Sequence, residues 1–283
     1  MTQVQELLRG ERFAFGSNWA SFLSLLDDDR VREAEKSLKN RLGVGTLRGK
    51  TVLDVGSGSG LFSLAARRLG AHVHSFDYDP QSVACTTELK RRFFPDDPEW
   101  TVEEGSILDN QYVSGLGLFD VVYSWGVLHH TGAMWVGIEH ALSRVAGGGQ
   151  LFIAIYNDQG WKSHFWWFIK FFYNKLPRPL NTVYAYTLGF GMHFLVIIKY
   201  TFKLKPMVAI APLLHYKQER GMSLMHDLVD WMGGFPFEFA RFAVLKDYLR
   251  SRGFELEQGK CGTSLGCHEM VFRRTHSKPT MAP

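Results

Sequence analysis

A glycine-rich loop is the first candidate site. It reads DVGSGSG over residues 54–60 and directly follows an apolar, β-branched run. Glycine after a strand allows a tight turn and lets a ligand approach the backbone closely. The spacing is GxGxG, with Leu61 where a dinucleotide-binding GxGxxG loop has its third glycine. The acid before the loop, Asp54, would not favour a pyrophosphate, but it would favour a ligand with a cationic ammonium or sulfonium group.

A second acid stands at the end of the next expected strand, where Asp77 closes the run HVHSFD. A carboxylate at this position can accept hydrogen bonds from both hydroxyls of a ribose. After the third expected strand, Ser106 and Ile107 are placed to contact the edge and the face of an adenine. The alternative interpretation is that Asp54 and Asp77 only cap strand ends. The pattern as a whole predicts a nucleoside site.

Four stretches, in this order, resemble the class I S-adenosylmethionine-dependent methyltransferases. They read VLDVGSGSG, HVHSFDYDP, EGSILD and FDVVYSWGVLHHTG, and they cover about residues 49–157. The motif LHHTG and the overall layout look most similar to the small-molecule branch around the ubiquinone-biosynthesis O-methyltransferases. One departure is Ser106, where many members carry Asp; a serine hydroxyl can also accept the exocyclic amine of adenine.

The resemblance implies S-adenosyl-L-methionine as the cofactor. In that family the glycine loop packs against the methionine part, the acid of the second strand binds the ribose, and residues after the third strand bind adenine. A NAD-dependent enzyme is the remaining alternative. The expected cofactor-binding residues are Asp54, Gly56, Ser57, Gly58, Gly60, Asp77, Tyr78, Ser106, Ile107, Ser124 and Trp125.

Two adjacent histidines, His129 and His130, are the candidate catalytic residues. They follow the fourth expected strand, at the sheet edge where open α/β folds bind ligands. If the methyl acceptor is a hydroxyl, a base must take its proton, and histidine titrates near neutral pH. Either histidine could act as this base. Alternatively, one of them only caps the following helix or hydrogen-bonds the loop.

Further polar and aromatic side chains are candidates for contacts with the acceptor: Asn157, Asp158, Trp161, Trp166 and His226. Asn157 and Asp158 end the fifth expected strand on the same sheet edge. With the histidines they could supply metal ligands, but these ligands come from scattered loops, and metal-free chemistry is commoner in the branch that the chain resembles. We therefore expect no metal.

The elements that must position these residues alternate between apolar β-branched runs and amphipathic helical runs. The expected strands are TVLDV, AHVHSFD, WTVEE, LFDVVYSW and GGGQLFIAIY, followed by FELEQGK and HEMVFRR, which close the sheet. The expected helices cover residues 21–42, 61–69, 80–92, 135–145 and 239–252, with Gly253 as the last cap. This alternation predicts an α/β fold with a Rossmann-like, doubly wound, seven-stranded and mostly parallel sheet.

Three parts are expected along the chain. Residues 1–48 form an N-terminal helical segment, 49–159 and 219–275 form the cofactor-binding methyltransferase domain, and 160–218 form a helical insertion after the fifth strand. The stretch FAFGSNW near the N-terminus either packs with the first helix or closes over the cofactor as a lid. The tail after Arg274 is expected to be unstructured.

The insertion differs in composition from the rest of the chain. Residues 160–218 hold eight of the 32 Lys and Arg residues and no Asp or Glu, whereas the remainder has 24 basic against 28 acidic residues. The insertion also holds 15 of the 40 aromatic residues. Its uncharged window, 180–198, contains Asn, Thr, Tyr, Gly and His, so its apolarity is low for a membrane-spanning helix. The open interpretations are a substrate cap, a membrane surface, and ordinary core or dimer packing.

Composition narrows the class of protein. The chain has 283 residues, 46% of them hydrophobic and 21% charged, as expected for a globular protein with a sizeable core. The three cysteines lack CxxC spacing and the N-terminus lacks an apolar run, which favours a reducing cytosol without a signal peptide. The charge of +4 is not spread evenly, so no nucleic-acid partner is expected.

We therefore expect a cytoplasmic methyltransferase, with peripheral contact to the inner face of a membrane as a further option. Its acceptor atom would be an oxygen, or else a carbon or nitrogen, of a small apolar, aromatic or lipid-like molecule. The alternatives are a methyltransferase of tRNA or another macromolecule, and a cofactor-binding member of the fold without catalysis.

Overall fold

The computed structural model describes residues 26–177, 179–205, 207–208, 232–264 and 266–275. The candidate residue His226, the stretch FAFGSNW and the tail after Thr275 lie outside these described residues.

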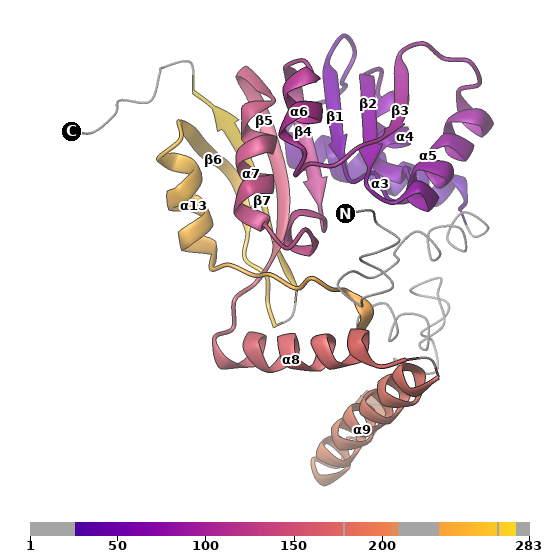
Figure 1. Ribbon diagram of the computed structural model, residues 1–283, viewed down its shortest axis with the longest axis vertical. Coiled ribbons are helices and arrows are strands. Elements are labelled where there is room, and N and C mark those ends of the chain that lie inside the picture. The colour runs from indigo at the N-terminus through magenta and orange to yellow at the C-terminus, as the bar shows by residue number, and fades with distance from the viewer. Residues whose placement is uncertain (1–25, 178, 206, 209–231, 265, 276–283) are drawn as a thin grey trace.

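A seven-stranded sheet forms the centre of the fold (Figure 1). Its strands are β1 Thr51–Val55, β2 His72–Asp77, β3 Trp100–Glu104, β4 Phe119–Trp125, β5 Val145–Tyr156, β6 Phe254–Lys260 and β7 Cys267–Arg274. The order is β3-β2-β1-β4-β5-β7-β6. The five strands β1 to β5 run parallel to one another, and β7 is antiparallel to both β5 and β6. The strand order reverses between β1 and β4, and open α/β sheets bind ligands at the carboxyl end of such a reversal.

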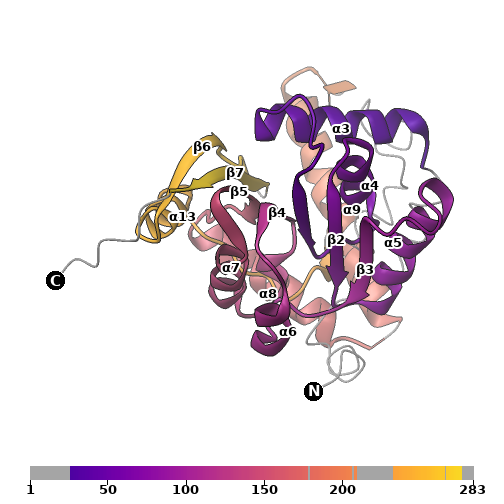
Figure 2. The same cartoon turned by 90° about the horizontal axis from the view of Figure 1, so that it is seen from above.

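Helices cover both faces of the sheet (Figure 2). The helices α3 Asp28–Leu42, α4 Leu61–Arg68 and α5 Pro80–Phe93 pack on one face, and α6 Asn110–Gly115, α7 Met134–Ser143 and α13 Phe242–Arg250 pack on the other. Successive side chains of a strand point to opposite faces of the sheet. Val52 therefore packs in the core under α3, α4 and α5, and Leu53 packs in the core under α6, α7 and α13. The predicted doubly wound α/β fold with seven strands is thus confirmed.

Several element boundaries differ from those expected. The first described helix begins at Asp28 rather than at residue 21, because the side chain of Asp27 accepts a hydrogen bond from the Arg30 backbone and caps it. Val145 starts β5 instead of ending α7. Helix α13 ends at Arg250, and Gly253 takes its positive φ of 79° in the turn beyond it.

The described part of the insertion is helical. Helix α8 Trp161–Lys175 lies across the end of the sheet from which β5 leaves, and α9 Leu180–Phe202 extends away from the body (Figure 1). A small separate core joins them to the returning chain, formed by Ile169, Tyr173, Ala185 and Met232. The chain therefore enters α9 and comes back from it at the same place.

Candidate active site

The glycine loop is held by backbone hydrogen bonds to the end of β2. The backbone N–H groups of Gly56 and Ser57 both donate to the carbonyl of Phe76, at 2.9 and 3.1 Å. Gly56 has φ +76°, and a Cβ there would lie 2.4 Å from Cγ1 of Val127. A side chain at this position would both strain the backbone and collide with the loop after β4. The glycine is therefore required by the close approach of these two loops.

Asp77 organises the loop from the end of β2. Its Oδ2 accepts from the Gly58 backbone and its Oδ1 from the Asp79 backbone, both at 2.9 Å. Burial raises its pKa to about 6, although these backbone hydrogen bonds act to lower it. Each carboxylate oxygen has two lone pairs, so both can still accept from a neighbouring diol. These two acceptor oxygens suit the two hydroxyls of a ribose.

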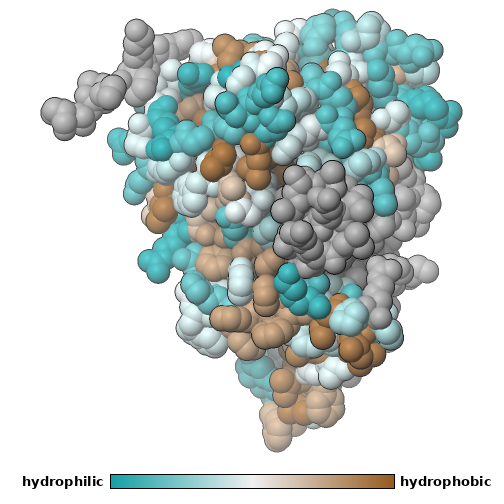
Figure 3. Space-filling view, in the orientation of Figure 1, coloured by the Kyte–Doolittle hydropathy of each residue, from teal (hydrophilic) through white to brown (hydrophobic). Residues whose placement is uncertain are grey.

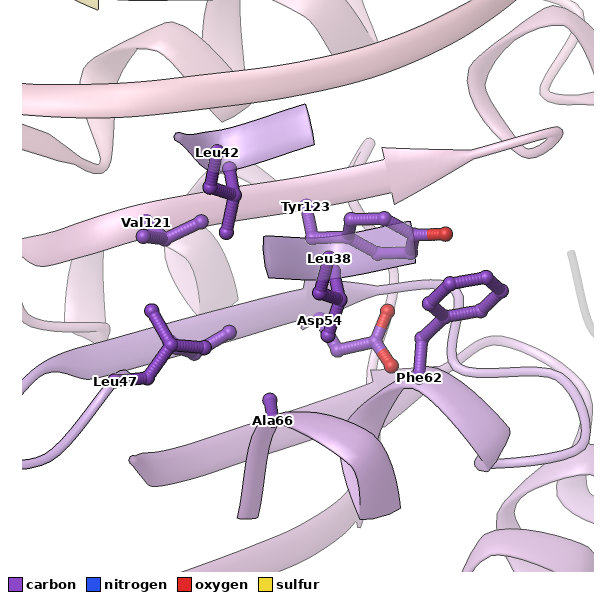
Figure 4. Close-up of a pocket in the computed structure, with 9 residues that line it drawn as sticks. Leu38, Leu42, Leu47, Asp54, Phe62, Ala66, Val121 and Tyr123 are labelled. Carbon is purple, nitrogen blue, oxygen red and sulfur yellow. The ribbon is translucent and has the colours of Figure 1, made fainter. Parts of the chain in front are cut away.

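The side chain of Asp54 faces the first turn of α4. Its carboxylate accepts a hydrogen bond from Ser63 and is 3% exposed. It lines a small cavity of about 10 Å³ (Figure 4) together with Leu38, Leu42, Leu47, Val52, Phe62, Ala66, Val121 and Tyr123. Burial raises the pKa of Asp54 to about 7, and the charge of Asp77 adds to the shift while Ser63 opposes it. A contact of Asp54 with the cofactor remains a prediction.

The substitution Asp54→Asn should stabilise the ligand-free protein more at pH 8 than at pH 5. The folded-state pKa of Asp54, about 7, lies above the usual 3.8, so the wild type loses stability as pH rises between these values. A neutral amide escapes this loss, which amounts to about 2–3 kcal/mol between pH 5 and 7. Urea unfolding at the two pH values measures the difference.

Asp120→Asn is the matched control. Burial acts to raise the pKa of Asp120, but hydrogen bonds from Thr51 and Lys50 outweigh it and lower the pKa. This control should therefore destabilise the protein at pH 8. Equal effects of Asp54→Asn at both pH values would contradict the buried, neutral Asp54.

The other expected cofactor residues gather at the same sheet edge. Ser106 accepts from the Leu108 backbone at 3.2 Å, and Ile107 is buried beside it in the core. Ser124 is fully buried and donates to the Val55 carbonyl at 3.2 Å, whereas Trp125 is 45% exposed. Ser57 pairs with Thr86 at 2.9 Å, Gly58 and Gly60 have positive φ, and Tyr78 follows Asp77 directly. Their contacts with a cofactor remain predictions.

The two candidate catalytic histidines occupy the short helix η1 Leu128–His130 after β4. They are 1% and 8% exposed, and their ring centroids lie 4.5 Å apart. Nδ1 of His130 lies 2.7 Å from the carbonyl of Pro236. Because a carbonyl only accepts, Nδ1 carries the hydrogen, and Nε2 is then the basic nitrogen of a neutral ring.

His129 lies deeper and has different surroundings. Its ring centroid is 4.0 Å from that of Tyr156, and neither of its nitrogens meets hydrogen-bond geometry with a described residue. Burial lowers the pKa of His129 well below its usual range, the charges of His130 and Lys170 lower it further, and the nearby Ala154 backbone only partly opposes this shift. His129 is therefore neutral near pH 7, as a proton acceptor must be.

Lys170, like Tyr156 and Phe237, was not among the candidate site residues expected from the sequence. It lies on the buried face of α8 and is 1% exposed, with Nζ 5.0 Å from the ring centroid of Phe237. Burial lowers its pKa to about 7. Trp166, Ile169, Lys170 and Tyr173 follow helical spacing, so a periodicity analysis of α8 would have placed this lysine on the inner face.

Lys170→Met should raise the pKa of His129, because the lysine charge disfavours protonation of the imidazole. The titration midpoint of the His129 imidazole, followed by NMR with labelled histidine, measures the shift. Lys162→Met removes an exposed lysine of the same helix and should leave the midpoint unchanged. If the midpoint does not move in Lys170→Met, the charge of Lys170 has no effect on the pKa of His129.

A short stretch of chain, residues 232–240, ties α8 to the histidines. The Glu238 N–H donates to the His129 carbonyl at 2.9 Å, and the carboxylate of Glu238 accepts from the Met134 backbone. Asn174 of α8 donates to the Gly233 carbonyl at 3.0 Å. Phe237 packs on Tyr156 with ring centroids 5.0 Å apart. Four rings and one amine, from η1, β5, α8 and residues 232–240, thus lie together, and we name His129, His130, Tyr156, Lys170 and Phe237 the edge cluster.

The expected acceptor residues lie in several places. Asn157 donates to the carbonyls of Gly262 and Ser264, and Asp158 accepts from the Gly160 backbone at 2.7 Å. Trp161 is 73% exposed, while Trp166 packs on the small core of the insertion. The structure does not bring these four residues into the edge cluster, and their contact with an acceptor remains a prediction. Among the described residues, no group of His, Cys, Asp or Glu could hold a metal ion.

The reversed strand order and the buried acid at the end of β2 fit a nucleoside-binding α/β protein, and comparisons with known proteins narrow the class. The family described as "Methyltransferase domain" matches residues 27–183, more than half of the sequence. The chain belongs to this family.

Curated relatives match over short stretches. The chain is similar to the ribosomal protein L11 methyltransferase of Xanthomonas oryzae, with 47% identity over 49 residues, 17% of this chain and 16% of the relative. It is similar to the enzyme of the same name from Anoxybacillus flavithermus, with 30% identity over 115 residues, 35% of this chain and 36% of the relative. The chain thus spans well under half of the length of these relatives.

Solved structures share the fold over nearly the whole chain. Magnesium protoporphyrin IX methyltransferase from Synechocystis, with bound SAH, is 15% identical with a TM-score of 0.55, covering 96% of this chain and all of that one. An O-methyltransferase family protein from Burkholderia thailandensis is 16% identical with a TM-score of 0.53, covering 98% of this chain and 68% of that one. These likenesses support the fold.

This chain therefore contains a methyltransferase domain. Its own residues fit S-adenosylmethionine as the cofactor. Asp77 offers carboxylate oxygens to the ribose, and the glycines keep side chains away from the loop beside it. When bound, the cofactor supplies a methyl group on a sulfonium, which a nucleophile can attack in line.

Proposed function

We propose that this enzyme transfers the methyl group to an oxygen of a small apolar, aromatic or lipid-like acceptor. The edge cluster carries the proposal. Its two histidines and the rings of Tyr156 and Phe237 lie beside the carboxyl edge of β4 and β5, next to the aromatic helix α8. Apolar walls with a few convergent polar groups are the usual composition of small-molecule sites.

The chain's own part in this reaction is binding, positioning and proton transfer. Asp77 and the glycine loop hold the nucleoside, and the rings of the edge cluster exclude water from the acceptor. Nε2 of His130, or a ring nitrogen of His129, takes the proton of the acceptor hydroxyl as its oxygen attacks. Within the same proposal, Asn157, Asp158, Trp161, Trp166 and His226 contact the acceptor, and residues 160–218 act as its cap.

The narrower assignment also belongs to this proposal. The motif LHHTG and the overall layout of the sequence support membership of the branch around the ubiquinone-biosynthesis O-methyltransferases. A lipid-like acceptor would reach the edge cluster from a bilayer. We therefore propose a cytoplasmic enzyme that works at the inner face of a membrane.

The test is to follow a labelled methyl group from S-adenosylmethionine into a cell extract. After incubation, the extract is separated into organic-soluble, small water-soluble and macromolecular fractions. The proposal expects label in the organic fraction with the wild type and none with Asp77→Ala. Label in RNA or protein instead would replace it with a macromolecular acceptor, and the absence of label in every fraction would favour a non-catalytic member of the fold.

A further inference from the structure

Large apolar side chains gather on the outer surface of the insertion. On α9, Phe190, Phe194 and Leu195 are 57%, 63% and 65% exposed. The outer face of α8 adds Phe165, Phe168 and Phe172, each more than half exposed. Figure 3 shows the apolar surface at the end of the molecule formed by α9. Soluble monomers seldom keep so continuous an apolar surface in water.

A stretch in the middle of α9 is exposed around the helix, while Ile197, Ile198 and Tyr200 beyond it are partly buried. From Phe190 to Val196, every residue except His193 is exposed, and this stretch is nearly two helical turns. A flat partner would cover one side of such a helix and leave the others in water. A lipid phase surrounds an inserted helix, so it satisfies this pattern better than a second protein surface does.

The charges next to these residues have one sign. Lys199, Lys203 and Lys205 are exposed at the end of α9, and no acidic residue occurs between Gly160 and Gln218. Lysines beside exposed phenylalanines are the usual composition of a surface that binds anionic lipid. Their long side chains can reach the headgroups while the helix lies deeper.

By length and composition alone, helix α9 is apolar enough to cross a membrane, contrary to what its polar residues led us to expect, and 11% of its most apolar window is buried. The topology argues against a crossing. Ala185 near its start and Met232 after its return pack in the same small core with Ile169. A spanning α9 would force residues 203–231 back through the hydrocarbon, and they include Lys203, Lys205, Lys217, Glu219, Arg220, Asp227 and Asp230. Charges are costly there.

We propose that α9 is a monotopic membrane anchor. Its distal half inserts into one leaflet of a bilayer that contains anionic phospholipid, and Lys199, Lys203 and Lys205 contact the headgroups. Only the biological role of the anchor rests on the proposed function, because an anchored enzyme can take a lipid-like acceptor from the leaflet. Binding to lipid itself requires neither the acceptor nor the cofactor.

Sedimentation of the full chain with vesicles tests the anchor. Vesicles of phosphatidylcholine with about one third phosphatidylglycerol should bind the protein roughly 100-fold more tightly than pure phosphatidylcholine, because three lysines face the lipid. Salt should weaken the binding, since it screens these charges. No binding to either vesicle would overturn the proposal, whatever the outcome of the methyl-transfer test.

Apolar variants locate the inserted residues. The triple variant Phe190→Ser, Phe194→Ser and Leu195→Ser should lose at least tenfold in binding to the anionic vesicles. The matched control, Leu118→Ser, Val136→Ser and Val244→Ser, removes residues 57%, 47% and 49% exposed on the cofactor-binding domain and should bind like the wild type. Stabilisation by S-adenosylmethionine should persist in both variants and shows that they are folded. Equal losses in the two variants would overturn the proposal.

Charge variants test the headgroup contact. Lys199→Glu, Lys203→Glu and Lys205→Glu together should remove the preference for anionic lipid. Lys36→Glu, Lys246→Glu and Arg250→Glu make the same charge change at exposed positions elsewhere and should keep the preference. A preference that survives in the first variant would overturn the headgroup contact.

Two further outcomes would overturn the proposal and assign a different role to α9. A dimer in solution that the apolar triple variant dissociates, without any binding to vesicles, would assign the surface to a second copy of this chain. Protein that stays in native membranes through alkaline extraction would mean that α9 spans the bilayer.

Discussion

Asp77→Ala should weaken the binding of S-adenosylmethionine by more than about 100-fold. A hydrogen bond to a charged group contributes about 1.5–3 kcal/mol, and Asp77 can accept one from each ribose hydroxyl. The alanine also releases the Gly58 and Asp79 backbones, so the loop loses the contacts that shape it. Titration calorimetry on the purified variant measures the loss.

Asp120→Asn serves as the control for this result. Asp120 accepts hydrogen bonds from Thr51 and Lys50 at the amino ends of β1 and β4, at the other end of these strands from the glycine loop. This variant therefore loses a structural carboxylate but no cofactor contact. Its affinity for the cofactor should match that of the wild type. An Asp77→Ala protein that binds within threefold of the wild type would contradict the nucleoside site.

The double substitution His129→Asn and His130→Asn should leave cofactor binding intact and reduce methyl transfer by about 10²–10⁴-fold. General base catalysis contributes a factor of this size. Asparagine can still donate to the Pro236 carbonyl, as His130 does, so η1 should keep its position. Transfer of labelled methyl into the organic fraction measures turnover, and a thermal shift with the cofactor measures binding.

The single variants separate the two histidines. The one that acts as base should carry nearly the whole loss, and the other should lose little. His72→Asn changes an exposed histidine at the start of β2, remote from the edge cluster, and should retain full activity. Unchanged turnover in the double variant would remove the histidines from the reaction.

The sheet could be predicted because its signals are local. Strands β1 to β4 are short runs that end in an acid or just before a glycine, and Val52 and Leu53 show the alternation that a sheet with two cores requires. The boundaries were less accurate. The start of α3 depends on one capping side chain among three consecutive aspartates, and six-residue α6 has too few turns to show a helical period.

The candidate site was predictable only in part. Gly56 and Asp77 belong to motifs of fixed spacing, so the sequence shows them directly. The edge cluster depends on contacts such as Glu238 with His129 and Phe237 with Lys170, which join residues far apart along the chain. No local pattern encodes such contacts. Lys170 also lies in a run of aromatic residues, where a lysine suggests a solvated end rather than a buried amine.

Calorimetric titration of the wild type with S-adenosylhomocysteine, and in parallel with NAD, tests the central claim most directly. The loop geometry, Asp77 and the family predict one tight binding site for S-adenosylhomocysteine, and the protein should be more stable to heat in its presence. They predict no binding of NAD. Binding of NAD without binding of S-adenosylhomocysteine would contradict the account.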